Sequence, residues 1–151
     1  MQVLNFPAYH FDLKSNENNK FIFSRLRKKY LHLTPEEWVR QHCVQYLIGE
    51  KDFSINLLNE EKQVMINGMS KRYDLVGYKP NGEIRLLVEC KAPSVKITQE
   101  TFNQIARYNM TLKADYLMVT NGIKHYYCQI DYIQESYIFL RDLPDFKSHQ
   151  K

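Results

Sequence analysis

Two acidic residues and a lysine in the middle of the chain have types and spacing that could do chemistry. Asp74 lies in the run YDLVGY, and Glu89 and Lys91 lie in the run LLVECK. Both runs are rich in β-forming residues, and the dipeptide Asn81-Gly82 between them is preferred in two-residue type I′ turns. We therefore predict a β-hairpin that carries all three residues.

The predicted turn determines which residues face each other. With the Asn-Gly pair as the turn, Asp74 lies opposite Glu89, and their Cβ atoms lie about 5 Å apart. Lys91 lies two residues beyond Glu89 and shares its face, whereas Cys90 alternates onto an apolar face. Two carboxylates and one ammonium group are thus expected at one place. A slip of one residue would break this arrangement, because it exchanges the two faces.

Opposed carboxylates repel each other unless a cation lies between them. Mg²⁺ prefers carboxylate oxygens and keeps several waters, so Asp74 and Glu89 are candidate ligands for Mg²⁺, or for Mn²⁺ in its place. The backbone carbonyl of Cys90 is a further candidate ligand. Such a metal activates water and shields a phosphoryl group, and Lys91 would orient that water or stabilise developing charge. A surface salt-bridge cluster explains the same residues without catalysis, and the residues alone favour neither interpretation.

A predicted helix before the hairpin offers another carboxylate. Thr34 is a good N-cap, and the helix is expected to run to about Ile48, with Gly49 as its stop. Glu36 or Glu37 could reach a metal through water, and we prefer Glu37. A capping box between Thr34 and Glu37 explains the second glutamate equally well.

A second helix is expected over residues 98–112, with an apolar stripe that contains Phe102, Ile105 and Ala106. Gln104 and Tyr108 lie four residues apart on another side of this helix. Such a polar pair is usually the solvated side of a helix. If it faces the hairpin, it would hold DNA or support the site.

A basic stretch near the N-terminus contains Arg25, Lys28 and Lys29. Short charge runs are more often solvated edges, and the alternative is a patch that contacts phosphates. The other predicted elements are a hairpin, five strand-like runs and a fraying polar tail. The hairpin is YHFDLK–SNENN–KFIFSRL, the runs are 53–57, 64–67, DYLMVT, IKHYYCQI and YIFL, and the tail is DFKSHQK. Their order predicts an α/β (α+β) fold, with a central mixed β-sheet flanked by helices.

Length and composition narrow the class of protein. A chain of 151 residues suits one domain over 1–151. The net charge of +4 permits binding to a polyanion without demonstrating it. Three distant cysteines indicate neither a disulfide framework nor a zinc site. No signal peptide or membrane span is visible, so we expect a cytoplasmic protein with no membrane partner.

Several segments in order resemble the N-terminal nuclease domain of the R subunit of type I restriction enzymes. They are LTPEEWVRQ, YDLVGY, LLVECKAPSVKITQETFNQIARYN and TNGIKHYY, and the resemblance covers about residues 25–145, after an N-terminal hairpin extension. That domain is similar to other PD-(D/E)XK nucleases, which have the restriction-endonuclease-like fold. The resemblance implies a metal-dependent endonuclease that hydrolyses DNA phosphodiester bonds.

The resemblance also implies roles for individual residues. Asp74 looks like the metal-binding aspartate of the family, and Glu89 and Lys91 look like its E-x-K pair. Gln104 and Tyr108 match the accompanying Q-x-x-x-Y motif, which supports the active site and DNA. The chain departs from the family by having Tyr73 where proline is common. It also lacks a phosphate-binding loop and room for a helicase motor, so we expect a stand-alone relative without ATP-driven translocation.

Two other functions remain open at this stage. One is a catalytically silent module that binds nucleic acid or protein in a defence or repair system. The other is a repair or recombination nuclease for branched or single-stranded DNA, because such proteins recognise phosphate geometry and shape as much as bases. The expected partners are DNA, a separate helicase or specificity subunit, and a second copy of the chain.

Overall fold

The computed structural model describes residues 1–66 and 68–147, except the side chains of residues 62, 64, 66, 108, 110 and 111. Its elements in chain order are β1 (Leu13–Ser15), β2 (Lys20–Ser24), β3 (Lys29–His32), α1 (Pro35–Gly49), the short helix η1 (Ile55–Leu57), β4 (Leu58–Ile66), β5 (Met69–Tyr78), β6 (Ile84–Cys90), α2 (Gln99–Leu112), β7 (Tyr116–Thr120), β8 (His125–Asp131) and β9 (Ser136–Leu140).

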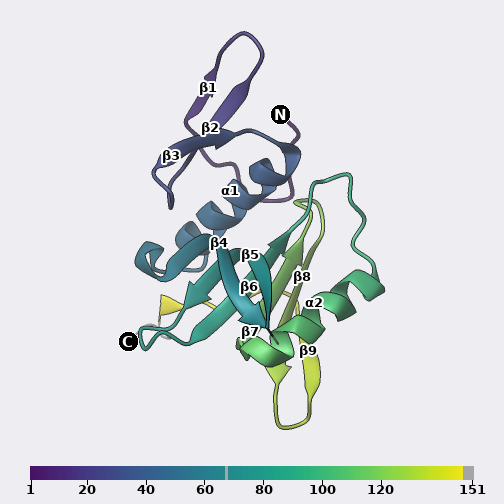
Figure 1. Cartoon of the computed structure of the whole chain (residues 1–151). Helices are drawn as coiled ribbons and strands as arrows, with labels where there is room; N and C mark the ends of the chain where they lie inside the picture. The colour runs from purple at the N-terminus through teal and green to yellow at the C-terminus, as the bar shows by residue number, and fades with distance from the viewer. Residues whose placement is uncertain (67, 148–151) are drawn as a thin grey trace.

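The strands form two separate sheets. A six-stranded sheet has the order β4-β5-β6-β7-β8-β9, in which only β6 and β7 run parallel. A three-stranded antiparallel sheet, β1-β2-β3, stands apart from it on the far side of α1 (Figure 1). The large sheet with its two helices confirms the predicted mixed sheet flanked by helices.

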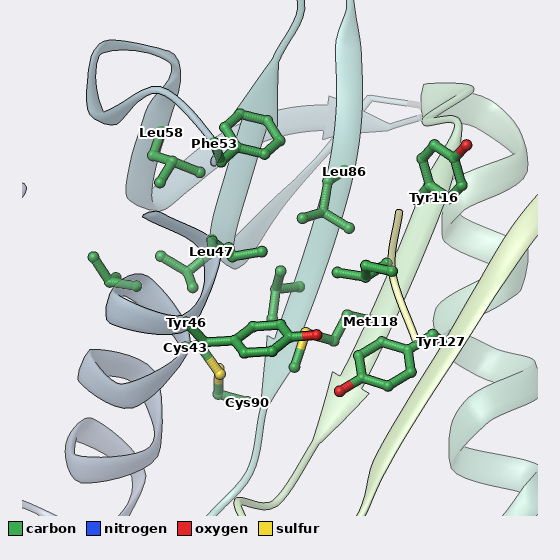
Figure 2. Close-up of a cluster of buried hydrophobic side chains, with 14 of the residues drawn as sticks. Cys43, Tyr46, Leu47, Phe53, Leu58, Leu86, Cys90, Tyr116, Met118 and Tyr127 are labelled. Atoms are coloured by element: carbon green, nitrogen blue, oxygen red, sulfur yellow. The ribbon is translucent and has the colours of Figure 1, made fainter. Parts of the chain in front are cut away.

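Alternation along the strands gives the large sheet two apolar faces. Leu86 and Val88 pack with Leu47 of α1, in a cluster that Figure 2 shows. Leu87 lies between them in sequence and packs on the opposite face, with Phe102 of α2. Each helix therefore covers one face, because successive side chains of a strand point in opposite directions.

Helix α1 begins as predicted, with Thr34 Oγ1 accepting the N–H of Glu37 at 3.0 Å. The rest of the predicted capping box is wrong, because the Glu37 carboxylate turns to other partners and the Thr34 N–H binds His32 O. Gly49 is the last helical residue rather than a left-handed stop, and Glu50 caps the helix in a right-handed conformation. Helix α2 begins at Gln99, next to the predicted start at residue 98, and Thr98 is its N-cap.

The central hairpin has the predicted register but a different turn. Lys79 O accepts the N–H of Gly82, and the Lys79 N–H binds Glu83 O, so three residues form the loop. Gly82 has φ +90°, which glycine adopts without a steric penalty. A bulge near Gly77 and Tyr78 then shifts the register by one residue, and Leu75 pairs with Val88. The bulge cancels the one-residue shift that the longer loop introduces, so the strands have the predicted register.

The ends of the chain also differ from the predictions. The N-terminal hairpin is confirmed, but the prediction missed β3 as its third strand. Residues 53–57 are not a strand: Phe53 is a buried core residue that precedes η1. The tail does not fray at Phe146, which is buried and packs on Phe53 with ring centroids 4.9 Å apart. The end of the predicted strand at Asn67 and residues 148–151 lie outside the described residues. No described helix is long and apolar enough to span a membrane.

Candidate active site

Asp74 is held at the place where β5 leaves its pairing with β6. The paired residues end at Leu75 and Val88, and one further step of this register places Asp74 beside Glu89, as predicted. Asp74 Oδ2 accepts the N–H of Cys90 at 2.7 Å. This hydrogen bond joins the middle of β5 to the last residue of β6 and fixes the orientation of the carboxylate.

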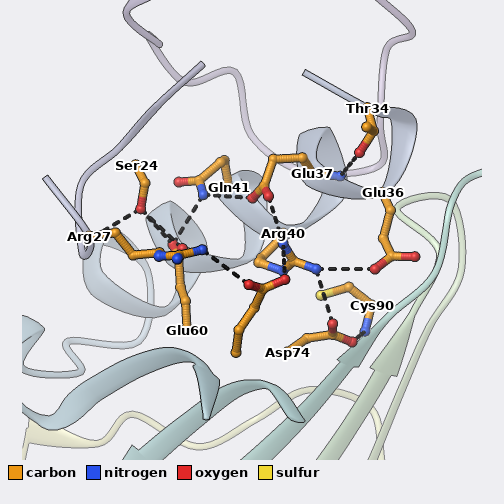
Figure 3. Close-up of polar contacts among 11 residues, drawn as sticks. Ser24, Arg27, Thr34, Glu36, Glu37, Arg40, Gln41, Glu60, Asp74 and Cys90 are labelled. Carbon is orange, nitrogen blue, oxygen red and sulfur yellow. Dashed lines mark hydrogen bonds and ion pairs between the residues drawn. The ribbon is translucent and has the colours of Figure 1, made fainter. Parts of the chain in front are cut away.

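The other oxygen of Asp74 is bound by a buried arginine of α1. Arg40 Nη2 lies 3.1 Å from Asp74 Oδ1, and Arg40 Nη1 lies 2.6 Å from Glu37 Oε1. The same guanidinium lies 3.4 Å from Glu61 and 3.1 Å from Glu36 (Figure 3). Burial alone would lower the pKa of Arg40, but the surrounding carboxylates raise it above its usual value. Arg40 therefore stays charged and anchors Asp74 to the helix.

Glu89 is much less satisfied than Asp74. Its side chain is only 8% exposed, and Oε1 lies 3.9 Å from Lys71 Nζ, which is too far for a hydrogen bond. That buried oxygen has no hydrogen-bond partner among the described residues. Burial, and then the Asp74 carboxylate, raise the pKa of Glu89 to about 8. The two carboxylates thus lie close enough to oppose each other's ionisation, which is the arrangement that the sequence predicted.

Lys91 and Glu36 complete the polar surroundings of the two carboxylates. The backbone of Lys91 is fixed because its N–H binds Thr120 O at 2.8 Å. Its ammonium group forms no ion pair within 4.0 Å in the described part of the chain, but its charge lowers the pKa of Glu89. Burial, and then Asp74, raise the pKa of Glu36, whereas Arg40 and Lys91 oppose this shift. Glu36 therefore lies in the electrostatic field of the site.

The structure distinguishes the two helix glutamates that the sequence left open. Both Glu37 oxygens are already bound, one by Arg40 and the other by Gln41 Nε2 at 2.9 Å. Arg40 lies between Glu37 and Asp74 in Figure 3. Glu36 is 46% exposed and senses the charges of both Asp74 and Lys91. We therefore prefer Glu36 over Glu37 as the helix carboxylate nearest to the site.

The described side chains among the remaining predicted site residues form no contact with the carboxylate pair. Gln104 is exposed on α2 and forms no hydrogen bond with a described residue, and the side chain of Tyr108 lies outside the described residues. Arg25 donates to Gln45 Oε1 at 3.3 Å, beside α1. Lys28 and Lys29 are exposed on the small sheet. Their roles stay predictions.

Sequence reasoning missed Arg40, although a partial signal was present. Arginine three and four residues after two glutamates is a favourable spacing on a helix, so its contacts with Glu36 and Glu37 were predictable. Its contact with Asp74 joins residues 34 positions apart in the chain. Only the packing of α1 on the sheet brings these two residues together.

The residues present fit a divalent cation. A buried carboxylate oxygen without a donor, beside a second carboxylate, is an environment that a cation would satisfy. Asp74 accepts one bond at each oxygen, and each carboxylate oxygen has two lone pairs. The described residues contain no group of three or more His, Cys, Asp or Glu side chains arranged around a metal. Two carboxylates with carbonyl and water ligands would suit Mg²⁺.

Comparisons with known proteins agree with this architecture. Residues 35–144 match the family described as type I restriction enzyme R protein N terminus. One similar solved structure is a fragment assigned to an HsdR subunit of a type I restriction enzyme from Vibrio vulnificus, with a TM-score of 0.51 and 20% identity. The match covers 74% of this chain and 24% of that chain, so this chain spans about a quarter of its length. The search of curated proteins found no match.

Proposed function

This chain belongs to the family of type I restriction enzyme R protein N termini, and we propose that it is a Mg²⁺-dependent nuclease that hydrolyses DNA phosphodiester bonds. The observation that carries the proposal is the pair formed by Asp74 and Glu89. Glu89 is buried with an oxygen that lacks a donor among the described residues, and Lys91, which forms no ion pair with a described residue, follows two positions later.

The proposed division of labour follows from the contacts of each residue. Asp74 and Glu89 would hold the metal, with the backbone carbonyl of Cys90 as a further ligand. When bound, Mg²⁺ would supply Lewis-acid stabilisation of a phosphoryl oxygen and lower the pKa of a bound water. Lys91 has no carboxylate within 4.0 Å in the part of the chain that the structure describes, so its ammonium group would orient the attacking water and stabilise negative charge.

Arg40 acts as a positioning residue in this proposal. It binds Asp74 Oδ1 from the side of α1 (Figure 3). A fixed Asp74 loses little freedom when a metal binds, and such preorganisation favours binding. Glu36 lies at the exposed rim, where it would contact the metal through water.

Cleavage of supercoiled plasmid tests the proposal. The protein is incubated with Mg²⁺ or Mn²⁺, and nicked and linear products are measured. We expect Asp74→Asn, Glu89→Gln and Lys91→Met each to lower the rate by about 100-fold or more, the usual cost of removing one electrostatic stabiliser. EDTA should abolish cutting. Lys147→Met is the matched control, because it removes an exposed lysine at the other end of the chain.

Two results would overturn the proposal. One is equal cutting by the wild type and all variants, which would indicate a contaminating nuclease. The other is no cutting at all together with no Mg²⁺ binding by calorimetry. The second result would favour the silent binding module, in which the carboxylates are purely structural.

The family name suggests partners beyond DNA. R proteins are named for their place in a multi-subunit restriction enzyme, and we propose that this chain also works with a separate helicase or specificity subunit. If the chain has one active site, cutting both strands of a duplex favours a dimer of two copies of the chain. Size-exclusion chromatography with light scattering, with and without DNA, measures the number of copies.

A further inference from the structure

One face of the small sheet carries four aromatic side chains that belong to neither core cluster. Phe21 lies opposite His32 and Phe23 lies opposite Tyr30, with ring centroids 4.9 and 5.3 Å apart. Lys14 pairs with Phe21 on the neighbouring strand, and its Nζ lies 5.0 Å from the centre of the Tyr30 ring. We call these five residues the aromatic face.

The aromatic face is unusual because its rings are not used to build the core. Ile22 lies between two of them in sequence and is fully buried on the opposite side of the sheet. Tyr30 is 36% exposed, and Phe21 and Phe23 are half-buried against neighbours of their own sheet. Large rings are normally placed where they remove most apolar area from water. A strip of paired rings on a sheet face therefore indicates a binding role.

The segment that holds the aromatic face also holds the net charge of the chain. Residues 10–33 contain six Lys or Arg and two acidic residues, a net charge of +4. The rest of the chain contains fifteen of each and is neutral. Lys20, Lys28 and Lys29 are exposed and form no ion pair with a described residue. The positive charge is thus concentrated in the segment that holds the rings, and three of its lysines can meet an anionic partner without breaking an ion pair to a described residue.

We propose that the aromatic face binds single-stranded nucleic acid. Bases would stack on the rings while the surrounding lysines contact phosphates, which is how sheet platforms and single-strand grooves recognise unpaired strands. A duplex cannot use the rings in this way, because its bases are already stacked on each other. The inference deepens the proposed nuclease function, on which it rests, by naming an unpaired strand as part of the substrate.

Contacts at the base of the small sheet fix its position relative to the candidate active site. Ser24 Oγ lies 3.0 Å from a Glu60 oxygen of β4. Arg27 Nη1 lies 3.1 Å from Glu61, and Glu61 in turn contacts Arg40, which binds Asp74. Figure 3 shows this connected set of polar contacts. A chain of polar contacts therefore connects the base of the small sheet with Asp74.

Fluorescence anisotropy with labelled (dT)20 in EDTA tests the proposal with the full chain. The EDTA prevents cleavage, so binding is measured separately from catalysis. We expect Phe23→Leu/Tyr30→Leu to raise Kd about tenfold or more, because each stacked base contributes roughly 5- to 100-fold. Phe139→Leu is the matched control, since Phe139 is 56% exposed on β9 of the large sheet. It should leave Kd unchanged.

Further measurements distinguish single-stranded nucleic acid from a duplex and from an anionic membrane surface. Lys14→Gln/Lys29→Gln should weaken binding and reduce its salt dependence, and it serves as the second test if the ring variant fails to fold. Unchanged Kd in both double variants overturns the proposal, as does equal affinity for a blunt duplex or a preference for anionic vesicles. Asp74→Asn should bind (dT)20 like the wild type. A wild-type protein that binds (dT)20 but does not cut DNA would therefore overturn the nuclease proposal alone.

Discussion

The two sheets of this protein are stabilised in different ways. The six-stranded sheet is covered by a helix on each face, and its central strand β7 is buried at every residue. The three-stranded sheet contributes no residue to the two core clusters of the described chain, and its strands are mostly exposed or half-buried. It is attached to the rest of the molecule through polar contacts such as Ser24 to Glu60.

The two kinds of sheet suit the two proposed tasks, which are holding a pair of carboxylates and binding a nucleic-acid strand. Placing two carboxylates together requires a rigid support, because the support must overcome their mutual repulsion. The large sheet provides it with apolar packing on both sides. Binding a flexible anion requires exposed charge and exposed rings, which the small sheet provides. The four predictions below test this separation, in order of decreasing expected effect.

The largest expected effect comes from substituting Arg40, and Arg27, which contacts the same Glu61, provides the comparison. Arg40→Met should lower the free energy of unfolding by about 3–5 kcal/mol, because it leaves buried carboxylates without their cation. Arg27→Met should cost less than about 1 kcal/mol, since both Arg27 and Glu61 are about one-third exposed. Urea denaturation measures both values. Equal losses would mean that the small sheet is as tightly integrated as the large one.

Apolar truncation should also affect the two sheets unequally. Leu117→Ala removes a fully buried side chain from β7 and should cost about 2–5 kcal/mol in global stability. Ile22→Ala removes a fully buried side chain from β2, and we expect a smaller global loss with opening of residues 13–32. Hydrogen exchange resolves the two effects. Global exchange in the Ile22 variant would contradict the comparison.

The polar attachment of the small sheet should have a moderate effect. Ser24 is fully buried, donates to Glu60 and accepts the Arg27 N–H at 3.1 Å. Ser24→Ala should cost about 1–3 kcal/mol, because it leaves buried polar groups unsatisfied. Thermal unfolding measures the loss, and Ser15→Ala at an exposed strand position is the control. An unchanged melting temperature would show that water replaces the hydroxyl without cost.

The smallest effect expected is a dependence on pH. Burial lowers the pKa of His42 and of His125, so the folded protein binds these protons less readily than the unfolded chain. Their contribution to stability is therefore present above about pH 6.5, the usual pKa of histidine, and is lost as the pH falls below it.

Both histidines contact the N-terminal segment that leads into the small sheet. His125 Nε2 lies 2.6 Å from Asn5 O, and the His42 ring lies 4.7 Å from Phe11. The histidine contribution to stability should fall between pH 7.5 and 5.5, whereas the raised pKa of Glu89 acts in the opposite direction. His42→Gln/His125→Gln should therefore remove the histidine contribution and leave the opposite trend. Denaturant titrations at several pH values measure the slope. A slope that is the same in the double variant would assign the pH dependence to other groups.

Local signals were sufficient for most of the elements around the candidate site. Thr34 and Thr98 marked the starts of both helices, because their side chains accept N–H groups that have no partner within the helix. Alternation of apolar residues placed Cys90 on the core face and Glu89 and Lys91 away from it. These features depend on residues a few positions apart, and the sequence states such relations directly.

The register of the central hairpin was predicted correctly for an incomplete reason. The sequence indicated a two-residue turn at Asn81-Gly82, whereas the chain forms a longer turn and then a bulge near Tyr78. Both deviations shift the pairing by one residue, in opposite directions. Apolar burial on both faces favours the final register, because any other would place charged residues in the core.

The sequence by itself determined the carboxylate pair, the lysine beside it, the N-cap of the first helix, the start of the second helix and the mixed sheet. All of these follow from spacing along one strand, helix or hairpin. Only the tertiary structure decided that Arg40 binds Asp74, that Glu36 rather than Glu37 faces the site, and that the small sheet has an exposed aromatic face. Each of these depends on how helices and sheets pack against each other. Such contacts join residues far apart in the chain, and no local propensity encodes them.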